Sequence, residues 1–149
     1  MTMAVAALLL AGAVVGGAKE KPVAATVLQV DDILGFAGGD LHFILREDRS
    51  FVYIKRFEGK ANIRGALTAG QRDALMKKLI DAGLFTVKGM PQDPRIADGA
   101  SFSVRVLYQG RKRHLAVDRQ HKFAKLVRTE LAKVAKAAKN PGPTRVARQ

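Results

Sequence analysis

The residues of this chain that could support acid–base or metal chemistry are few and lie far apart in the sequence. Its three histidines are His42, His114 and His121, and none belongs to a pair with the spacing of a zinc peptidase helix. We therefore expect no zinc site, and we expect each histidine to lie at the surface or half-buried. His114 and His121 could approach each other, but the sequence provides no obvious carboxylate to join them.

Three aspartates, Asp31, Asp32 and Asp40, flank a glycine-rich segment. Carboxylates can gather in this way around Ca²⁺, but the spacing matches no EF-hand loop. Solvated carboxylates in a turn are therefore the preferred interpretation. The glycine-rich segment is also not a phosphate-binding loop, because no Lys-Ser or Lys-Thr pair follows it and no helix is expected to begin there.

The candidate nucleophiles have no supporting sequence context. Ser50, Ser101 and Ser103 lack the G-x-S-x-G pattern of a nucleophile elbow, and the chain has no cysteine. We therefore predict a non-enzymatic binding module with no metal and no small-molecule cofactor. Catalytic triads assemble residues from distant positions, so a pocket that joined His114, His121 and a carboxylate by hydrogen bonds would contradict this prediction.

The clearest structural element is an amphipathic helix within Thr68–Phe85. Thr68 is a good N-cap residue, and Gln71 three positions later completes a capping box. Gly83 stands where a left-handed C-cap residue is expected. The apolar stripe of this helix consists of Leu75, Met76, Leu79 and Ile80. Such a stripe must be buried, and the alternating segments on both sides of the helix supply a sheet.

Alternation of apolar and polar residues predicts strands before and after this helix. The predicted strands span residues 26–30, 41–47, 51–57, 101–108 and 111–117, and residues 63–67 are a candidate for a further short strand. A second amphipathic helix is expected over residues 120–138. Its predicted buried stripe consists of Phe123, Leu126, Val127, Leu131, Val134 and Ala138. This order of elements predicts an α+β fold with a four- to five-stranded antiparallel sheet and two helices packed on one face.

Both ends of the chain are expected to lie outside this domain. Residues 1–18 carry no charge, and their apolar stretch is shorter than the ~20 residues of a membrane span. Small residues then precede a charged segment, as in a signal peptide, although the usual basic start is missing. We predict a signal-like targeting segment at 1–18, a linker at 19–25, a single domain at 26–139 and a flexible basic tail at 140–149.

A targeting segment predicts a periplasmic or secreted protein. The alternative is that residues 1–18 form a buried helix or strand of the domain itself.

The strongest compositional signal is a formal net charge of +13. A field of this sign attracts polyanions through counterion release. The candidate polyanion-binding residues are Arg105, Lys112, Arg113, Lys122, Lys125, Arg128, Lys133 and Lys136. Few aromatic residues stand among them, so base stacking is not expected. For a secreted protein the candidate partners are anionic lipid, lipopolysaccharide, acidic proteins or nucleic acid; the alternative is a basic surface with no dedicated partner.

Several segments also follow the order of features of a known family. Gly35-Phe36-Ala37-Gly38 follows the first strand, the first helix ends in Asp81-Ala82-Gly83-Leu84-Phe85, and Asp98-Gly99 precedes the strand that contains Phe102–Val106. Over most of residues 26–134 the chain resembles the emfourin-type inhibitors, small bacterial proteins that inhibit thermolysin-like metalloproteases. The family usually has a second glycine before the phenylalanine, where this chain has Leu34-Gly35.

The resemblance implies a metalloprotease-like partner, and we expect the inhibitor itself to be a monomer. Loops on a rigid scaffold concentrate binding residues, which favours the loops at 35–40 and 88–99. The candidate protein-binding residues are Gly35, Phe36, Ala37, Gly38, Met90 and Pro91. Phe36 between glycines is the candidate anchor. The alternative is that Phe36 packs in the core beneath the second helix while the glycines only turn the chain.

Overall fold

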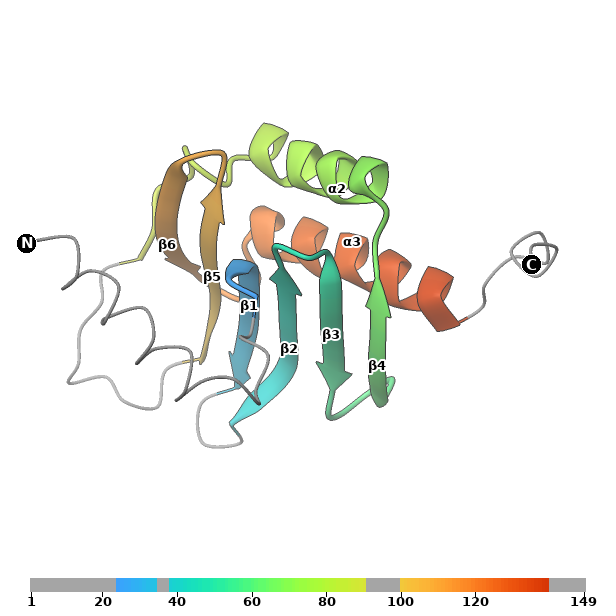
Figure 1. The fold of residues 1–149 in the computed structure, drawn as a ribbon. Helices are drawn as coiled ribbons and strands as arrows, with labels where there is room; N and C mark the ends of the chain where they lie inside the picture. Colours follow the sequence, from blue (N-terminus) through green and yellow to red (C-terminus); the bar gives the residue numbers. More distant parts are fainter. Residues whose placement is uncertain (1–23, 35–37, 91–99, 140–149) are drawn as a thin grey trace, which may run out of the picture.

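The computed structural model of the chain describes residues 24–34, 38–90 and 100–139 (Figure 1). Its elements are β1 (Thr26–Leu34), β2 (Gly39–Arg46), β3 (Ser50–Lys55), β4 (Ala61–Ala66), α2 (Ala69–Asp81), β5 (Ala100–Tyr108), β6 (Arg111–Val117) and α3 (Lys122–Lys139). The predicted targeting segment, most of the predicted linker and the predicted basic tail lie outside the described residues.

The strands form one open antiparallel sheet in the order β4-β3-β2-β1-β5-β6. The α+β class and the antiparallel sheet are confirmed, but the sheet has six strands rather than four or five. The additional strand is β4, whose apolar alternation is weak but which pairs with β3 along its whole length, from Ser50 opposite Ala66 to Lys55 opposite Ala61. Strand β1 also extends beyond the predicted 26–30, to Leu34.

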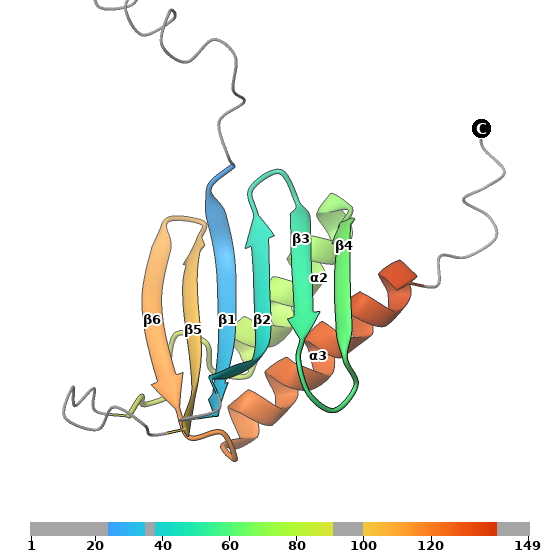
Figure 2. The ribbon, with the colours of Figure 1, turned by 90° about the horizontal axis from the view of Figure 1, so that it is seen from below.

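Both helices lie on the same side of the sheet and leave the other face of the strands open (Figure 2). The core lies between these two layers, and its largest fully buried side chains are Phe43, Phe51, Phe102, Phe123, Leu28, Leu45, Met76, Leu79, Leu84, Leu115, Leu131 and Val30. The rings of Phe43 and Phe51 stack with their centroids 5.8 Å apart. Each such side chain contributes about 1.5–3 kcal/mol through burial, so the helices fix the sheet from one side.

The start and end of α2 follow the sequence prediction. The Thr68 hydroxyl accepts a hydrogen bond from the Gln71 amide at 3.0 Å, and the Gln71 side chain accepts one from the Thr68 amide at 2.8 Å. Gly83 follows the helix with a φ of 113°, which only glycine adopts without strain. A Cβ atom there would also lie 2.3 Å from Val87, so Gly83 lets the chain fold back.

The buried stripe of α3 differs in part from the prediction. Phe123, Val127 and Leu131 are buried as expected, but Leu126 is 36 % exposed. At about 100° per residue, Leu126 lies roughly 100° from Val127 and turns away from the sheet. On its other side the buried stripe includes two small residues, Ala124 and Ala135, which sequence hydrophobicity does not single out.

Candidate functional site

The two loops predicted to bind a protein leave the sheet at the same end. Leu34, the last residue of β1, pairs with Ala100, the first residue of β5. The Met90 amide donates a hydrogen bond to the Ala116 carbonyl at 2.7 Å, close to the end of β6. We call this end of the sheet, where residues 34, 38, 39, 90 and 100 lie, the loop end. Four of the predicted binding residues lie outside the described residues: Gly35, Phe36, Ala37 and Pro91. The structure therefore does not decide whether Phe36 is buried.

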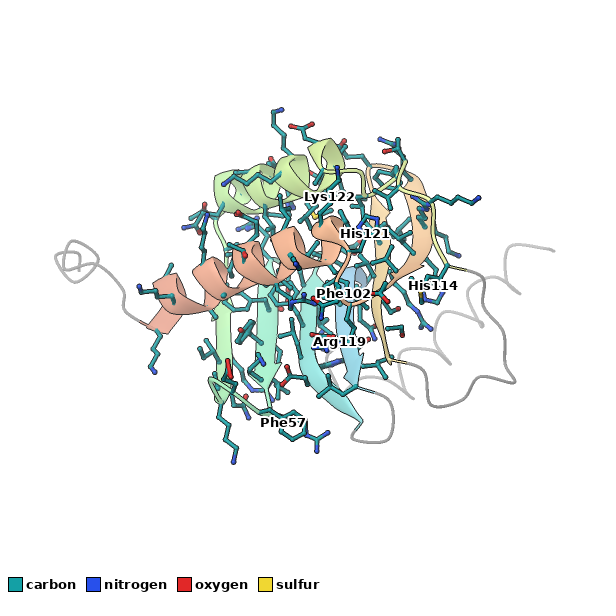
Figure 3. The ribbon with its side chains drawn as sticks, turned by 180° about the vertical axis from the view of Figure 1, so that it is seen from behind. Phe57, Phe102, His114, Arg119, His121 and Lys122 are labelled. Carbon is teal, nitrogen blue, oxygen red and sulfur yellow. The ribbon has the colours of Figure 1, made fainter. Side chains whose placement is uncertain are left out.

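An exposed aromatic side chain also lies at the loop end. Phe57, in the turn between β3 and β4, is 42 % exposed, and the guanidinium of Arg56 lies 4.9 Å from its ring centroid (Figure 3). The Arg56 side chain donates a hydrogen bond to the Gly39 carbonyl at 2.9 Å, which ties this turn to the start of β2. The sequence placed Phe57 in a strand, because it continues the phase of Phe51 and Tyr53, whereas β3 ends at Lys55.

Asp40 holds the same turn from inside the protein. Its carboxylate, nearly buried, accepts hydrogen bonds from the Lys55 ammonium and from the Phe57 amide, the latter at 3.1 Å. Burial by itself raises the pKa of Asp40, but the bonds from Lys55 and Phe57 outweigh it, so the pKa lies below its ordinary value. Asp40 is therefore a structural carboxylate and not the solvated turn residue that was predicted.

Asp32 is likewise internal. It is fully buried and accepts hydrogen bonds from the Arg119 guanidinium, one of them at 3.1 Å, while Arg128 Nη1 lies 3.5 Å from Asp32 Oδ2. Arg128 also donates to the Arg119 carbonyl at 2.7 Å and lies 5.4 Å from the Phe102 ring centroid. The prediction of a solvated Asp32 is therefore wrong, and Arg128, which was predicted to bind polyanions, has these internal contacts instead of a fully exposed side chain. Position 32 continues the inward phase of Leu28 and Val30, a signal that the sequence analysis missed.

Arg113 also has an internal role. Its guanidinium donates to the carbonyls of Leu84 and Val87, the first at 3.0 Å, and so fixes the segment after α2 against β6. The neighbouring Arg111 guanidinium lies 3.8 Å from the centroid of the Phe85 ring. Arg113 was predicted to bind polyanions, but its donors are directed to the protein's own backbone.

The open face of the sheet carries two separate polar pairs. His42 Nδ1 lies 2.6 Å from Asp31 Oδ1, and Ser103 Oγ lies 3.0 Å from His114 Nε2. His121 instead accepts a hydrogen bond from the Phe123 amide at the start of α3, so His114 and His121 do not share a partner in the described structure (Figure 3). In the described part of the chain no carboxylate contacts His114, so no Ser–His–Asp relay forms there.

The three aspartates near the glycine-rich segment each contact a different basic side chain. Asp31 contacts His42, Asp32 contacts Arg119 and Asp40 contacts Lys55. Within residues 24–34, 38–90 and 100–139, no group of three or more His, Cys, Asp or Glu side chains is arranged to hold a metal ion. A calcium site built from these aspartates is therefore not formed.

The remaining predicted basic residues divide between two surfaces. Arg105 and Lys112 are exposed on the open face of the sheet. The four predicted lysines of α3 are exposed and, together with Lys139, form the other group, which we call the lysine stripe: Lys122, Lys125, Lys133, Lys136 and Lys139. At about 100° and 1.5 Å per residue, the lysine stripe covers an arc of about 120° and a length of roughly 26 Å. Among the described residues Lys133 pairs with Glu130, whereas the other four lysines form no ion pair.

A groove that the sequence analysis did not anticipate lies between α2, α3 and β4. Its volume is about 530 Å³, and its lining includes Phe51, Gly65, Ala66, Leu67, Ala74, Leu75, Val134, Ala137 and Ala138. Glu130 stands at its rim and accepts hydrogen bonds from Lys78 and Lys133 at 3.3 and 3.2 Å. Burial raises the pKa of Glu130, but the two ammonium groups outweigh it and lower the pKa overall. The groove is therefore apolar within and charged at its rim.

Comparison with known proteins assigns no function to these surfaces. No protein-family model matches the chain, and a search of curated proteins finds no matching sequence. In the described ranges, neither α2 nor α3 has the length and apolar character needed to cross a membrane.

Proposed function

We propose that this chain is a non-enzymatic binding module that engages a partner protein through the loop end of its sheet, as a protease inhibitor does. The observation that carries the proposal is the pairing of Leu34 with Ala100, because it brings the bases of both candidate loops together on one rigid sheet. The partner class, a thermolysin-like metalloprotease, follows from the resemblance to emfourin-type inhibitors. The signal-like segment favours an encounter in the periplasm or outside the cell.

The described part of the loop end has the features of a docking surface. Two of its side chains, Phe57 and Met90, are large, apolar and 42 % and 37 % exposed. Hydrogen bonds from Arg56 to Gly39 and from Met90 to Ala116 hold the adjoining backbone in place. Rigid apolar anchors on a fixed backbone lower the entropy cost of binding, so Phe57 and Met90 extend the predicted set around Phe36.

The test is inhibition of a thermolysin-like metalloprotease by the full chain. Phe36→Ala, Phe57→Ala and Met90→Ala should each weaken inhibition by about tenfold or more, the effect of losing an apolar anchor. The matched control is Leu107→Ala, since Leu107 is 47 % exposed but lies beside the β5–β6 turn at the opposite end of the sheet. Equal weakening by Leu107→Ala would contradict the proposal, as would the absence of inhibition by the unaltered chain.

The role of Phe36 can be separated from a role in packing. If Phe36 anchors a partner, Phe36→Ala leaves the melting temperature unchanged. A loss of about 3–5 kcal/mol in the free energy of unfolding is the result expected for a buried phenylalanine. That result would remove Phe36 from the proposed site and leave Phe57 and Met90 as its apolar residues.

A second candidate function, binding of polyanions, is favoured by the lysine stripe. Five exposed lysines on one side of α3 should attract a polyanion more strongly than the same net charge of +13 distributed evenly over the surface. Binding to duplex DNA as a probe should collapse between about 50 and 200 mM salt. The double variant Lys125→Gln/Lys136→Gln should reduce the slope of log K against log salt by about 2. The control Arg105→Gln/Lys112→Gln, on the open face, should leave the slope unchanged; the reverse result would exclude the lysine stripe.

A further inference from the structure

The outer edge of β4 presents backbone groups with no partner in the described structure. The Leu67 amide donates to the Arg49 carbonyl at 2.9 Å, so this pair is a hydrogen-bonded one. Hydrogen-bonded and non-hydrogen-bonded pairs alternate along an antiparallel ladder. It follows from the β3–β4 register that Asn62, Arg64 and Ala66 direct their N–H and C=O groups away from β3. Within the described residues no backbone hydrogen bond reaches these groups from outside the sheet.

Helix α3 extends beyond this edge on one side of the sheet, so a strand added to β4 would pack against it. Its C-terminal end extends past β4 in both ribbon views (Figures 1 and 2). Gly65 permits the crossing, because a Cβ atom at that position would lie 3.4 Å from the Cβ of Ala138 and 2.9 Å from the Phe51 ring. The exposed Ala137 and Ala138 on α3 also line the groove, so a strand added to β4 would cover apolar surface on its helix side.

The charges around this edge select the chemistry of what binds there. Arg64 lies on β4, and Lys78 and Lys133 stand at the rim of the groove. Among the described lining residues the single carboxylate is Glu130, which already accepts from Lys78 and Lys133. A basic segment would be repelled, and this includes a second copy of this chain, which would bring its own Arg64 to the same edge.

We propose that the edge of β4 and the adjoining groove bind an extended acidic peptide segment of a partner protein, which adds a seventh strand to the sheet. Apolar side chains at alternate positions of the segment lie on the helix side, against Ala138 and the groove. Acidic side chains at the other positions lie on the open face near Arg64. Main-chain hydrogen bonds to Asn62, Arg64 and Ala66 set the register, as in other cases of strand addition. This surface is separate from the loop end, and it shares Lys133 with the lysine stripe.

The test uses a labelled ten-residue peptide of alternating valine and glutamate as the probe and the full chain as the receptor. Asn62→Pro removes one outward N–H without changing charge or a bond to β3, and it should weaken binding by at least about tenfold. Asn62→Ala keeps the N–H and should bind within about twofold of the unaltered chain. Lys112→Pro, the matching change on the outer edge of β6, should also have no effect.

Two further results decide the proposal if Asn62→Pro fails to fold. In the unaltered chain, the valine–glutamate peptide should slow hydrogen exchange at the amides of Asn62, Arg64 and Ala66. The twin peptide with lysine in place of glutamate should bind at least about tenfold more weakly. Absence of binding, slowed exchange elsewhere, equal binding of both peptides, or equal loss in Lys112→Pro would each overturn the proposal.

Discussion

The two edges of the sheet are closed to different degrees. At β6, residues Gly89 and Met90 lie against the strand, and the Met90 amide takes the outward carbonyl of Ala116. Arg113 fixes this covering segment through its bonds to Leu84 and Val87. At β4 the chain turns directly from Ala66 into Leu67 and α2, and in the described structure no segment lies along the outer edge.

This difference shows that an edge strand is defined by its tertiary partners rather than by its own residues. Both β4 and β6 carry a basic residue at an outward-directed position, Arg64 and Lys112, which is a common defence against unwanted pairing. Strand β6 differs in that Arg113, on the same strand, binds the carbonyls of Leu84 and Val87. These bonds hold the segment that covers the outer edge of β6. On the β4 side the corresponding space is a groove, which makes this edge the one available for another chain.

The largest effect on stability should come from loss of the buried Asp32 carboxylate, which pairs with Arg119 and Arg128. Asp32→Ala leaves the guanidinium groups of Arg119 and Arg128 without their carboxylate, so the free energy of unfolding should fall by about 3–5 kcal/mol. Urea unfolding followed by circular dichroism measures the loss. The control Asp81→Ala breaks the exposed pair with Lys77 and should change stability by less than about 0.5 kcal/mol. A loss below about 1 kcal/mol for Asp32→Ala would show that this cluster does not hold β1 to α3.

A smaller effect is expected when the cover of β6 is released. Arg113→Ala removes charged hydrogen bonds to two backbone carbonyls and should cost about 1.5–3 kcal/mol. Hydrogen exchange of the Met90 amide should also become faster, because the segment that carries it loses its attachment. Lys112→Ala on the same strand is the control and should have little effect on either quantity. Unchanged exchange at Met90 would mean that Arg113 is not what keeps this edge covered.

The β4 side can be tested by overpacking. Gly65→Ala places a Cβ atom 2.9 Å from the buried Phe51 ring, so this ring must shift within the core, while the 3.4 Å to Ala138 of α3 leaves no spare room. Thermal unfolding should show a loss of about 1–3 kcal/mol. Gly59→Ala, whose Cβ would meet no atom within 4 Å, is a control for space, although its φ of 76° adds its own strain. No loss in Gly65→Ala would mean that the Phe51 ring is not tightly packed beneath β4.

The last prediction concerns pH and the turn that carries Phe57. Because the pKa of Asp40 is lowered in the folded protein, its contribution to stability is complete above the unfolded value of about 3.9. That contribution is lost as the pH falls through the folded pKa. The stability difference between the unaltered chain and Asp40→Asn should therefore be largest near neutral pH and shrink below about pH 4. A difference that stays constant down to pH 2 would contradict this assignment to Asp40.

The fold was predictable where local patterns agree with burial. The capping box of α2 and the hairpin of β5 and β6 follow directly from residues 68–71 and 101–117. The site was less predictable, because a basic residue has the same appearance in sequence whether it faces solvent or a buried partner. Arg113 and Arg128 are internal, whereas Lys122 and Lys136 are exposed, and only the register of strands and helices separates them. The groove beside β4 combines β4 and α2, which follow each other in the sequence, with the distant α3, and it has no local signature.

The measurement that tests the central claim most directly is hydrogen exchange of the full chain with and without a thermolysin-like metalloprotease under conditions of tight inhibition. Binding through the loop end predicts slower exchange at Leu34, at Gly38–Asp40 and at Met90, with α3 unaffected. Protection confined to the lysine stripe of α3, with no change at those residues, would contradict the account.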